Sequence, residues 1–131
     1  MRKKNGRTKR SGSVKFSVEK GNAKNLSLFK YSGIANSKAV DVVFTDGNGA
    51  ALVTKTASKA GAQPAKTLAE TPMNKHFRRA EKSIKSQAFD NFYRPDLQEA
   101  VLAKYTKVYS ANRIAKGVKK ALPMKQGRKK N

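Results

Sequence analysis

Apolar and polar side chains alternate in the first part of the chain in a way that is typical of β structure. Residues 14–18, Val-Lys-Phe-Ser-Val, alternate strictly, as a half-buried strand does. Residues 26–31 form a second, less regular candidate strand. Residues 40–44 and 50–54 are apolar runs on either side of residues 45–49, whose Asp-Gly and Asn-Gly pairs supply the positive φ angles of a tight hairpin. These patterns predict a small, mostly antiparallel sheet of about four strands.

The segment that follows the predicted hairpin lacks a clear pattern. Residues 55–70 are rich in Ala, Lys and Thr and show no sustained apolar period. Ala favours helix, so part of the segment could be helical, but Gly61 and Pro64 interrupt it. We therefore predict a mobile loop. Its three lysines, which would suit contacts along phosphates, are Lys55, Lys59 and Lys66.

The pattern then changes to the period of an α-helix. Thr71-Pro72 predicts a helix start with proline at the first helical position, and the helix is expected to run to about Phe89. Its apolar residues recur at intervals of three and four, so they share one face, and its basic residues lie on the opposite side. The apolar face comprises Met73, Phe77, Ala80, Ile84 and Ala88, and the basic face comprises Lys75, Arg78, Arg79, Lys82 and Lys85.

A second helix is predicted to begin at Pro95, after a connection over residues 90–94. Asp96 and Glu99 lie in its first turn, where the helix dipole favours carboxylates. Beyond Arg113 we expect this helix to fray. Its inner stripe comprises Leu97, Val101, Tyr105, Val108 and Asn112.

Charge is distributed unevenly along the 131 residues, whose 30 Lys and Arg against 8 Asp and Glu give a net charge of +22. The basic residues are concentrated at both ends, and blocks of like charge repel themselves until a polyanion neutralises them. We expect a basic arm (1–13), a single domain (14–112) and a basic tail (113–131). The predicted fold class is α+β: a small, mostly antiparallel sheet followed by two α-helices, with an extended basic arm and tail.

Composition excludes several classes of protein. The chain has no Cys and one His, which excludes disulfides and zinc fingers or knuckles. No apolar run approaches the roughly 18–20 residues that span a membrane, and the basic start lacks the apolar segment of a signal peptide. We therefore expect a soluble protein.

Catalytic and metal sites are not predicted either. His76 has no Ser or Cys partner that the sequence suggests, so we interpret it as a surface or RNA-facing residue rather than a general base. Asp90, Asp96 and Glu99 could hold a divalent metal in principle, but helix capping and dipole neutralisation explain two of them without one. We expect no enzyme activity and no cofactor.

Binding to a polyanion explains the charge. Lys and Arg placed on phosphates release condensed counterions, which gives an affinity that depends little on base sequence and falls steeply with salt. Phe29 and Tyr31 could stack on bases, although packing in the core is the commoner use of such residues. RNA is one candidate partner. A DNA-binding protein that packages chromatin is the alternative, and a small RNA-cleaving domain that uses His76 is a third.

Short segments along the body of the chain form an ordered set. They are residues 27–33 (Ser-Leu-Phe-Lys-Tyr-Ser-Gly), residues 38–42 (Lys-Ala-Val-Asp-Val), Asn74-Lys75 leading to Ser83-Ile84, and Tyr93-Arg94-Pro95-Asp96-Leu97 followed by Ala100. In this order they resemble the eukaryotic large-subunit ribosomal protein twenty-eight family. The resemblance covers about residues 26–112. Members of that family begin with a Trp-bearing apolar segment, whereas this chain has no Trp and begins with a basic arm.

The resemblance implies a non-enzymatic component of the large cytosolic ribosomal subunit. Such a protein would contact ribosomal RNA and neighbouring ribosomal proteins, and would pass through the nucleus or nucleolus during assembly. Arg94 matches the family's corner between two helices, where it could hold a phosphate bidentately or bond to a helix-end carbonyl instead. The full set of residues that we predict to contact RNA is Arg2, Lys3, Lys4, Arg7, Lys9, Arg10, Lys75, Arg78, Arg79, Lys82, Arg94, Arg113, Lys119, Lys120, Arg128, Lys129 and Lys130.

Overall fold

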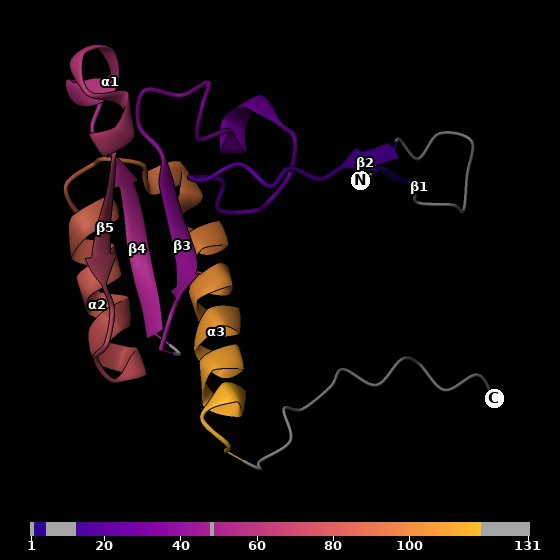
Figure 1. Ribbon diagram of the computed structural model, residues 1–131, viewed down its shortest axis with the longest axis vertical. Coiled ribbons are helices and arrows are strands. Elements are labelled where there is room, and N and C mark those ends of the chain that lie inside the picture. The colour runs from indigo at the N-terminus through magenta and orange to yellow at the C-terminus, as the bar shows by residue number, and fades with distance from the viewer. Residues whose placement is uncertain (1, 5–12, 48, 119–131) are drawn as a thin grey trace.

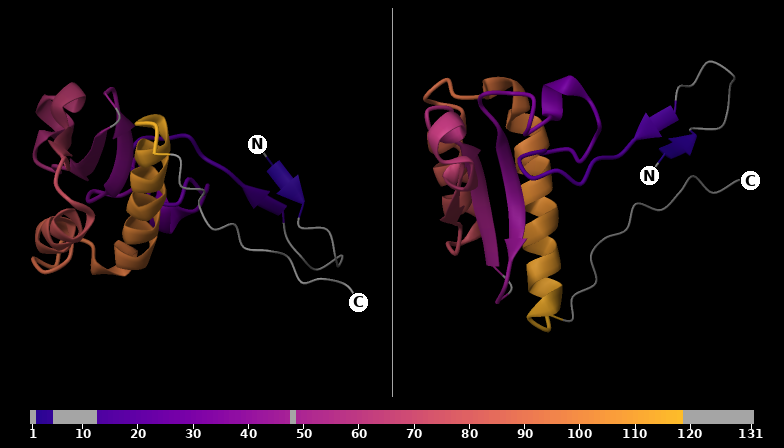
Figure 2. Two further views of the ribbon diagram at one scale, coloured as in Figure 1. Left: turned by 90° about the horizontal axis from the view of Figure 1, so that it is seen from below. Right: turned by 45° about the horizontal axis from the view of Figure 1, so that its top comes forward.

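A three-stranded antiparallel sheet with two helices on one of its faces forms the body of the protein (Figures 1 and 2). The computed structural model describes residues 2–4, 13–47 and 49–118. The sheet has the order β3-β4-β5, and the helices that cover it are α2 and α3. The α+β class is therefore confirmed, although the main sheet has three strands instead of the predicted four. Among the described residues, no helix is long and apolar enough to cross a membrane.

The predicted hairpin is confirmed. Strand β3 (Val40–Thr45) pairs with strand β4 (Gly49–Lys55) from Val40 opposite Thr54 to Thr45 opposite Gly49. Gly47 in the turn has a φ of +82°, which is the left-handed conformation that glycine adopts at little cost. The apolar runs on either side thus form adjacent strands because the turn between them is short.

The prediction of a loop over residues 55–70 is wrong at its C-terminal end, where the third strand of the sheet begins. Strand β5 (Leu68–Pro72) pairs antiparallel with β4, from Lys55 opposite Leu68 to Ala51 opposite Pro72. It is an edge strand, so Pro72 can take part although it has no N–H to donate. Before β5 the chain forms two short helical turns, α1 (Lys59–Ala62) and η2 (Pro64–Lys66).

The first long helix begins later than predicted. Helix α2 runs over Phe77–Ala88, because Pro72 ends strand β5 and Met73 still donates its N–H to the carbonyl of Ala50 on β4 (2.7 Å). The predicted apolar face is correct, since Ala80, Ile84 and Ala88 are all fully buried.

The second long helix follows the prediction closely. A short turn, η3 (Pro95–Leu97), leads into helix α3 (Gln98–Ala115). Leu97, Val101 and Tyr105 of the predicted stripe are buried. They pack with the helix-facing residues of the sheet and with Ile84 of α2. The core formed in this way includes Val40, Val42, Ala50, Leu52, Met73, Ala80, Ile84, Ala88, Phe89, Leu97, Val101 and Tyr105.

The N-terminal part differs most from the prediction. Strand β1 (Arg2–Lys4) pairs with strand β2 (Ser13–Lys15) in a short ladder that stands apart from the main sheet (Figures 1 and 2). Of the strand predicted over residues 26–31, only one bridge remains, between Phe16 and Leu26. Residues Phe29–Tyr31 form a 3₁₀ turn, η1, instead. The Phe29 side chain is 75% exposed, so its apolar character does not reflect packing on a sheet.

The segment between η1 and β3 is fixed by close packing and by one lysine. A Cβ atom at Gly33 would lie 2.2 Å from the carbonyl oxygen of Lys20 and 2.8 Å from Cα of Gly21, so no larger residue fits there. Lys55 Nζ donates to the carbonyls of Gly33 (2.9 Å), Ile34 (3.1 Å) and Asn36 (2.8 Å). These bonds use all three N–H groups of a lysine, so Lys55 holds the loop and not a phosphate.

Candidate nucleic-acid interface

The outward face of helix α2 carries exposed positive charge. Arg78, Arg79 and Lys82 are exposed there, and within the described part of the chain none of them has a carboxylate within ion-pair distance. Lys85 differs, because its Nζ lies 2.8 Å from Oε1 of Glu81 one turn earlier. Three of the basic residues predicted on this helix are thus free to meet an external anion.

The corner after α2 is built by its own side chains. Asn91 donates from Nδ2 to the carbonyl of Gln87 (2.7 Å) and accepts the N–H of Tyr93 at Oδ1 (3.1 Å). Phe92 has a φ of +53° and its side chain is exposed. The N–H of Arg94 donates to the carbonyl of Ala88 (3.0 Å). This local network holds the backbone from which Tyr93 and Arg94 extend, and their side chains contact different parts of the protein.

Tyr93 reaches the end of the hairpin. Its hydroxyl oxygen accepts the N–H groups of Ala39 (3.3 Å) and Lys55 (3.2 Å), which flank the last pair of the β3–β4 ladder. The hydroxyl also donates to the carbonyl of Lys55. Burial raises the pKa of Tyr93, so the hydroxyl stays protonated and keeps this donor. Tyr93 therefore joins the corner to the sheet.

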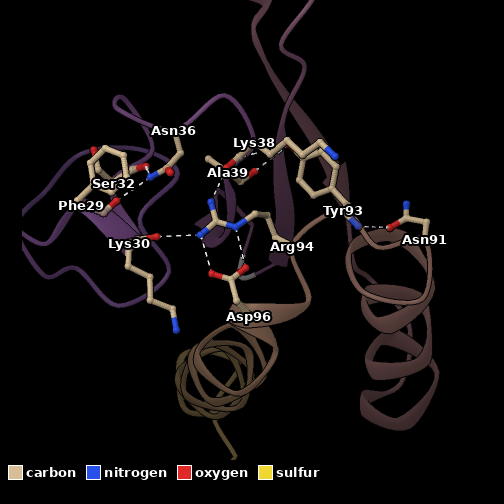
Figure 3. Close-up of polar contacts among 10 residues, drawn as sticks. All are labelled: Phe29, Lys30, Ser32, Asn36, Lys38, Ala39, Asn91, Tyr93, Arg94 and Asp96. Atoms are coloured by element: carbon tan, nitrogen blue, oxygen red, sulfur yellow. Dashed lines mark hydrogen bonds and ion pairs between the residues drawn. The ribbon is translucent and has the colours of Figure 1, made fainter.

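Arg94 makes its contacts inside the protein (Figure 3). Nη1 donates to the carbonyl of Lys38 (2.6 Å), Nη2 donates to the carbonyl of Lys30 (2.8 Å), and Nε and Nη2 donate to the two carboxylate oxygens of Asp96 (2.8 and 2.9 Å). Hydrogen bonding to Asp96 raises the pKa of Arg94, and the same bonds lower the pKa of the Asp96 carboxyl.

These contacts correct our prediction for Arg94. They use four of the five N–H groups of the guanidinium, and its side chain is only 14% exposed. The alternative, an intramolecular bond to carbonyl oxygens, is what the structure has, although the carbonyls belong to Lys30 and Lys38 and not to the end of a long helix. We therefore leave Arg94 out of the RNA contacts that we propose below.

Two lysines that the sequence did not single out lie near the ion pair of Arg94 and Asp96. The Lys38 ammonium lies 5.5 Å from the centre of the Tyr93 ring, and that of Lys30 lies 5.9 Å from the centre of the Tyr31 ring (Figure 3 shows Lys30 pointing away from Arg94). Phe29, next to Lys30, is exposed, whereas Tyr31 packs against the core. Exposed cations and an exposed aromatic ring thus share one surface, as is common in single-stranded RNA sites.

A second basic region lines a cleft under the hairpin turn. The cleft has a volume of about 650 Å³ and lies between the turn, the link before α2 and the end of α3. It brings together two residues that we predicted separately, Lys75 and Arg113, and adds Lys116 and His76, all of them exposed. No signal in the sequence relates these positions, because they meet only through the packing of α3 on the sheet.

The remaining predicted contacts lie at the two ends of the chain. Arg2, Lys3 and Lys4 form strand β1, and nothing further is described of their side chains. The others, which lie outside the described residues and stay predictions, are Arg7, Lys9, Arg10, Lys119, Lys120, Arg128, Lys129 and Lys130. Of the carboxylates weighed as metal ligands, Asp96 is ion-paired with Arg94.

Comparison with known proteins shows which family the sequence matches. The model of the Ribosomal L28e protein family matches residues 2–111. The large ribosomal subunit protein eL28 of Dictyostelium discoideum is 32% identical over 117 residues, which cover 88% of this chain and 86% of that protein. The protein of the same name from Schizosaccharomyces pombe is 32% identical over 108 residues, or 82% and 81% of the two chains. The chain therefore belongs to the ribosomal L28e family.

Proposed function

We propose that this protein is a structural component of the large subunit of the cytosolic eukaryotic ribosome, where it binds ribosomal RNA and neighbouring ribosomal proteins. Family membership together with the net charge of +22 carries the proposal. The two relatives described above are named as large-subunit proteins, which supports the same assignment. We propose no catalytic role and no cofactor.

Contacts to phosphates supply the binding energy in this proposal. The exposed cations of α2, namely Arg78, Arg79 and Lys82, neutralise one stretch of RNA backbone, and the basic ends of the chain follow others. Each phosphate that is neutralised releases counterions, so the affinity falls steeply as salt rises. Such contacts position the protein without reading base sequence.

The body of the protein holds these charges in fixed places. Tyr93 and Arg94 tie the corner after α2 to the sheet and to the segment around Lys30 and Lys38. This segment contains only one short 3₁₀ turn, so these contacts and those of Lys55 fix its course. Its two lysines and Phe29 form a second surface that we propose faces RNA, because an exposed aromatic ring beside cations can stack on an unpaired base.

Sedimentation of cell extracts tests the proposal directly. A tagged copy of the chain, expressed in eukaryotic cells, should sediment with large subunits and whole ribosomes, and crosslinking should recover ribosomal RNA. Imaging should place most of it in the cytoplasm and a newly made fraction in the nucleolus. Recovery of DNA in place of RNA would support chromatin packaging. A chain that stays in the soluble fraction after gentle lysis at low salt would refute the ribosomal assignment.

A further inference from the structure

Phe92, in the corner after α2, has a backbone conformation that phenylalanine rarely adopts. Its φ is +53°, in the left-handed region, where a bulky side chain is an outlier. Among the described residues, the other non-glycine residue with a positive φ is Asn25, and asparagine is one of the types that adopt this region most readily. Glycine or asparagine would therefore fold at position 92 at a lower cost than phenylalanine does.

The side chain of Phe92 is also strongly exposed. Its exposed fraction is 82%, the highest among the Phe and Tyr residues that the structure describes, so the ring contributes little packing to the fold. Residues with a strained backbone persist where the surrounding structure holds them, and they are concentrated at sites that bind a partner. The exposure and the backbone conformation together indicate that this ring acts outside the chain.

Hydrogen bonds on both sides hold Phe92 in place. Its own N–H donates to the carbonyl of Phe89 (2.9 Å). Its two neighbours in sequence are bonded to each other, because Asn91 Oδ1 accepts the N–H of Tyr93 (Figure 3), and the Tyr93 hydroxyl is bonded to the end of the hairpin. A ring on a backbone that is already fixed loses less conformational freedom when a partner binds, which favours affinity.

The charge around this ring indicates the kind of partner. Residues 86–93 and 95–103 contain no Lys or Arg, in a chain whose net charge is +22. Arg94 between them uses its guanidinium for contacts inside the protein. Asp90 and Glu99 are exposed, and neither has an ion-pair partner in the described part of the chain. The exposed charges along the chain on both sides of the ring are thus negative, which disfavours phosphates and favours a cationic partner.

Phe29, which is 75% exposed, differs from Phe92 in this respect. It lies beside Lys30 and Lys38 in the surface that, in the proposed function, faces RNA. An aromatic ring beside cations suits a nucleic acid, because the cations pair with phosphates while the ring stacks on a base. An aromatic ring between carboxylates suits an apolar pocket on a protein, with Lys or Arg at the rim of that pocket.

We propose that Phe92 anchors this chain to a neighbouring ribosomal protein. The ring enters an apolar pocket of that partner, and Lys or Arg residues at the rim of the pocket pair with Asp90 and Glu99. Aromatic anchors of this kind account for much of the binding energy of protein interfaces. The inference rests on the proposed function and adds to it a protein contact at the end of the molecule opposite the β3–β4 turn (Figure 1).

Photocrosslinking within large ribosomal subunits identifies what the ring touches. A tagged full chain carries p-benzoyl-L-phenylalanine in place of Phe92 or, separately, of Phe29, and large subunits purified from eukaryotic cells are irradiated. We expect position 92 to form an adduct with one ribosomal protein that survives ribonuclease, and position 29 to form an adduct that ribonuclease removes. An adduct of position 92 with RNA or with a second copy of this chain, or the lack of any adduct, would overturn the proposal.

The variant Phe92→Asn separates a binding role from a structural one. Because asparagine adopts the left-handed region more readily, the thermal unfolding temperature of the purified variant should stay unchanged or rise, by up to about 6 °C. A lower unfolding temperature would show that the ring stabilises the fold, and the anchor role would be refuted. Ile34→Asn is the matched control, since it removes an apolar side chain of similar exposure (76%) from another part of the surface.

The rate of release from purified large subunits measures the binding role. The wash is carried out at high salt, which weakens contacts to phosphates and leaves apolar contacts in place. Phe92→Asn should dissociate about 10-fold faster than the unmodified chain, and Ile34→Asn at the unmodified rate. Equal rates for Phe92→Asn and the unmodified chain would refute the anchor and leave the proposed ribosomal function standing. A full chain that does not sediment with large subunits at all would refute both.

Discussion

The ammonium group of Lys104 on α3 lies 2.5 Å from Oδ1 of Asp41 on β3 and joins the helix to an edge strand of the sheet. The Asp41 side chain is only 3% exposed, so its charge depends on this partner. Lys104 also donates to the carbonyl of Asn22 (3.2 Å) and to Oδ1 of Asn25 (3.1 Å). One lysine thus connects the sheet, the helix and the N-terminal loop.

The variant Lys104→Met should destabilise the fold by about 3–5 kcal/mol at neutral pH, because it leaves a buried carboxylate unpaired. Burial raises the pKa of Asp41 above its ordinary 3.8, and the bonds and charge of Lys104 counteract part of this rise. A raised pKa in the folded state means that the stability contributed by Asp41 is complete below its ordinary pKa and is lost as pH rises through the folded value. Without Lys104 this loss is larger, so the defect should shrink as pH falls towards about 4.

Urea denaturation of both proteins across this pH range measures the effect. Lys107→Met serves as the control, because Lys107 is an exposed lysine on the same helix. It should change the free energy of unfolding by no more than about 0.5 kcal/mol at any pH. A defect in Lys104→Met that is equally large at about pH 4 and about pH 7 would argue against an unpaired Asp41 charge as its cause.

Replacement of Arg94 by Gln should lower stability and leave the salt dependence of RNA binding unchanged. The guanidinium holds Asp96 and two backbone carbonyls, and hydrogen bonds to charged groups contribute about 1.5–3 kcal/mol. Chemical denaturation measures the first effect, and the slope of log affinity against log salt measures the second. A slope reduced by about one would instead show that Arg94 neutralises a phosphate.

Two lysines on the same helix offer a matched test of the cationic face. Lys82 is exposed without a carboxylate partner among the described residues, whereas Lys85 is paired with Glu81. Lys82→Gln should reduce the magnitude of the salt slope by about one, and Lys85→Gln should reduce it much less. Filter binding to ribosomal RNA over a range of salt gives both slopes. If both variants keep the salt slope of the unmodified protein, the RNA binds elsewhere than on this face.

Substitution of two isoleucines tests how much the packing of α2 in the core contributes to the stability of the fold. Ile84 is fully buried between the sheet and the helices, so Ile84→Ala should cost about 2–5 kcal/mol of stability. Ile114 near the end of α3 is 53% exposed, and the same substitution there should cost about 0.5 kcal/mol or less. Thermal or urea unfolding compares the two. A small loss at Ile84 would contradict the packing of α2 described above.

Local patterns predicted the elements that depend on local interactions. The hairpin follows from Asp46-Gly47 between two apolar runs, and the buried stripe of α3 follows from the spacing of Leu97, Val101 and Tyr105. Strand β5 escaped prediction because residues 68–72, Leu-Ala-Glu-Thr-Pro, have weak strand preference and become a strand only by pairing with the edge of β4.

Elements fixed by distant residues could not be predicted in this way. Residues 26–31 look like a strand, yet the carbonyl of Lys30 is bound by Arg94, which lies 64 positions away. The same distinction between local and distant interactions applies to the candidate interface. The charged face of α2 is visible in the sequence, whereas the meeting of Lys75 with Arg113 at the cleft depends on how α3 packs. The basic ends were predicted from charge, and their contacts remain predictions.

During synthesis of the chain, the contact between Arg94 and the Lys30 carbonyl can form only late. Lys55, which holds residues 33–36, is synthesised soon after them, but Arg94 comes 64 residues after the Lys30 carbonyl that it binds. The N-terminal half of a growing chain is therefore synthesised well before Arg94, whose contacts hold residues 30 and 38. We expect nascent chains that stop short of residue 94 to be cut readily by proteases around residues 30–38, and full-length chains to be resistant there.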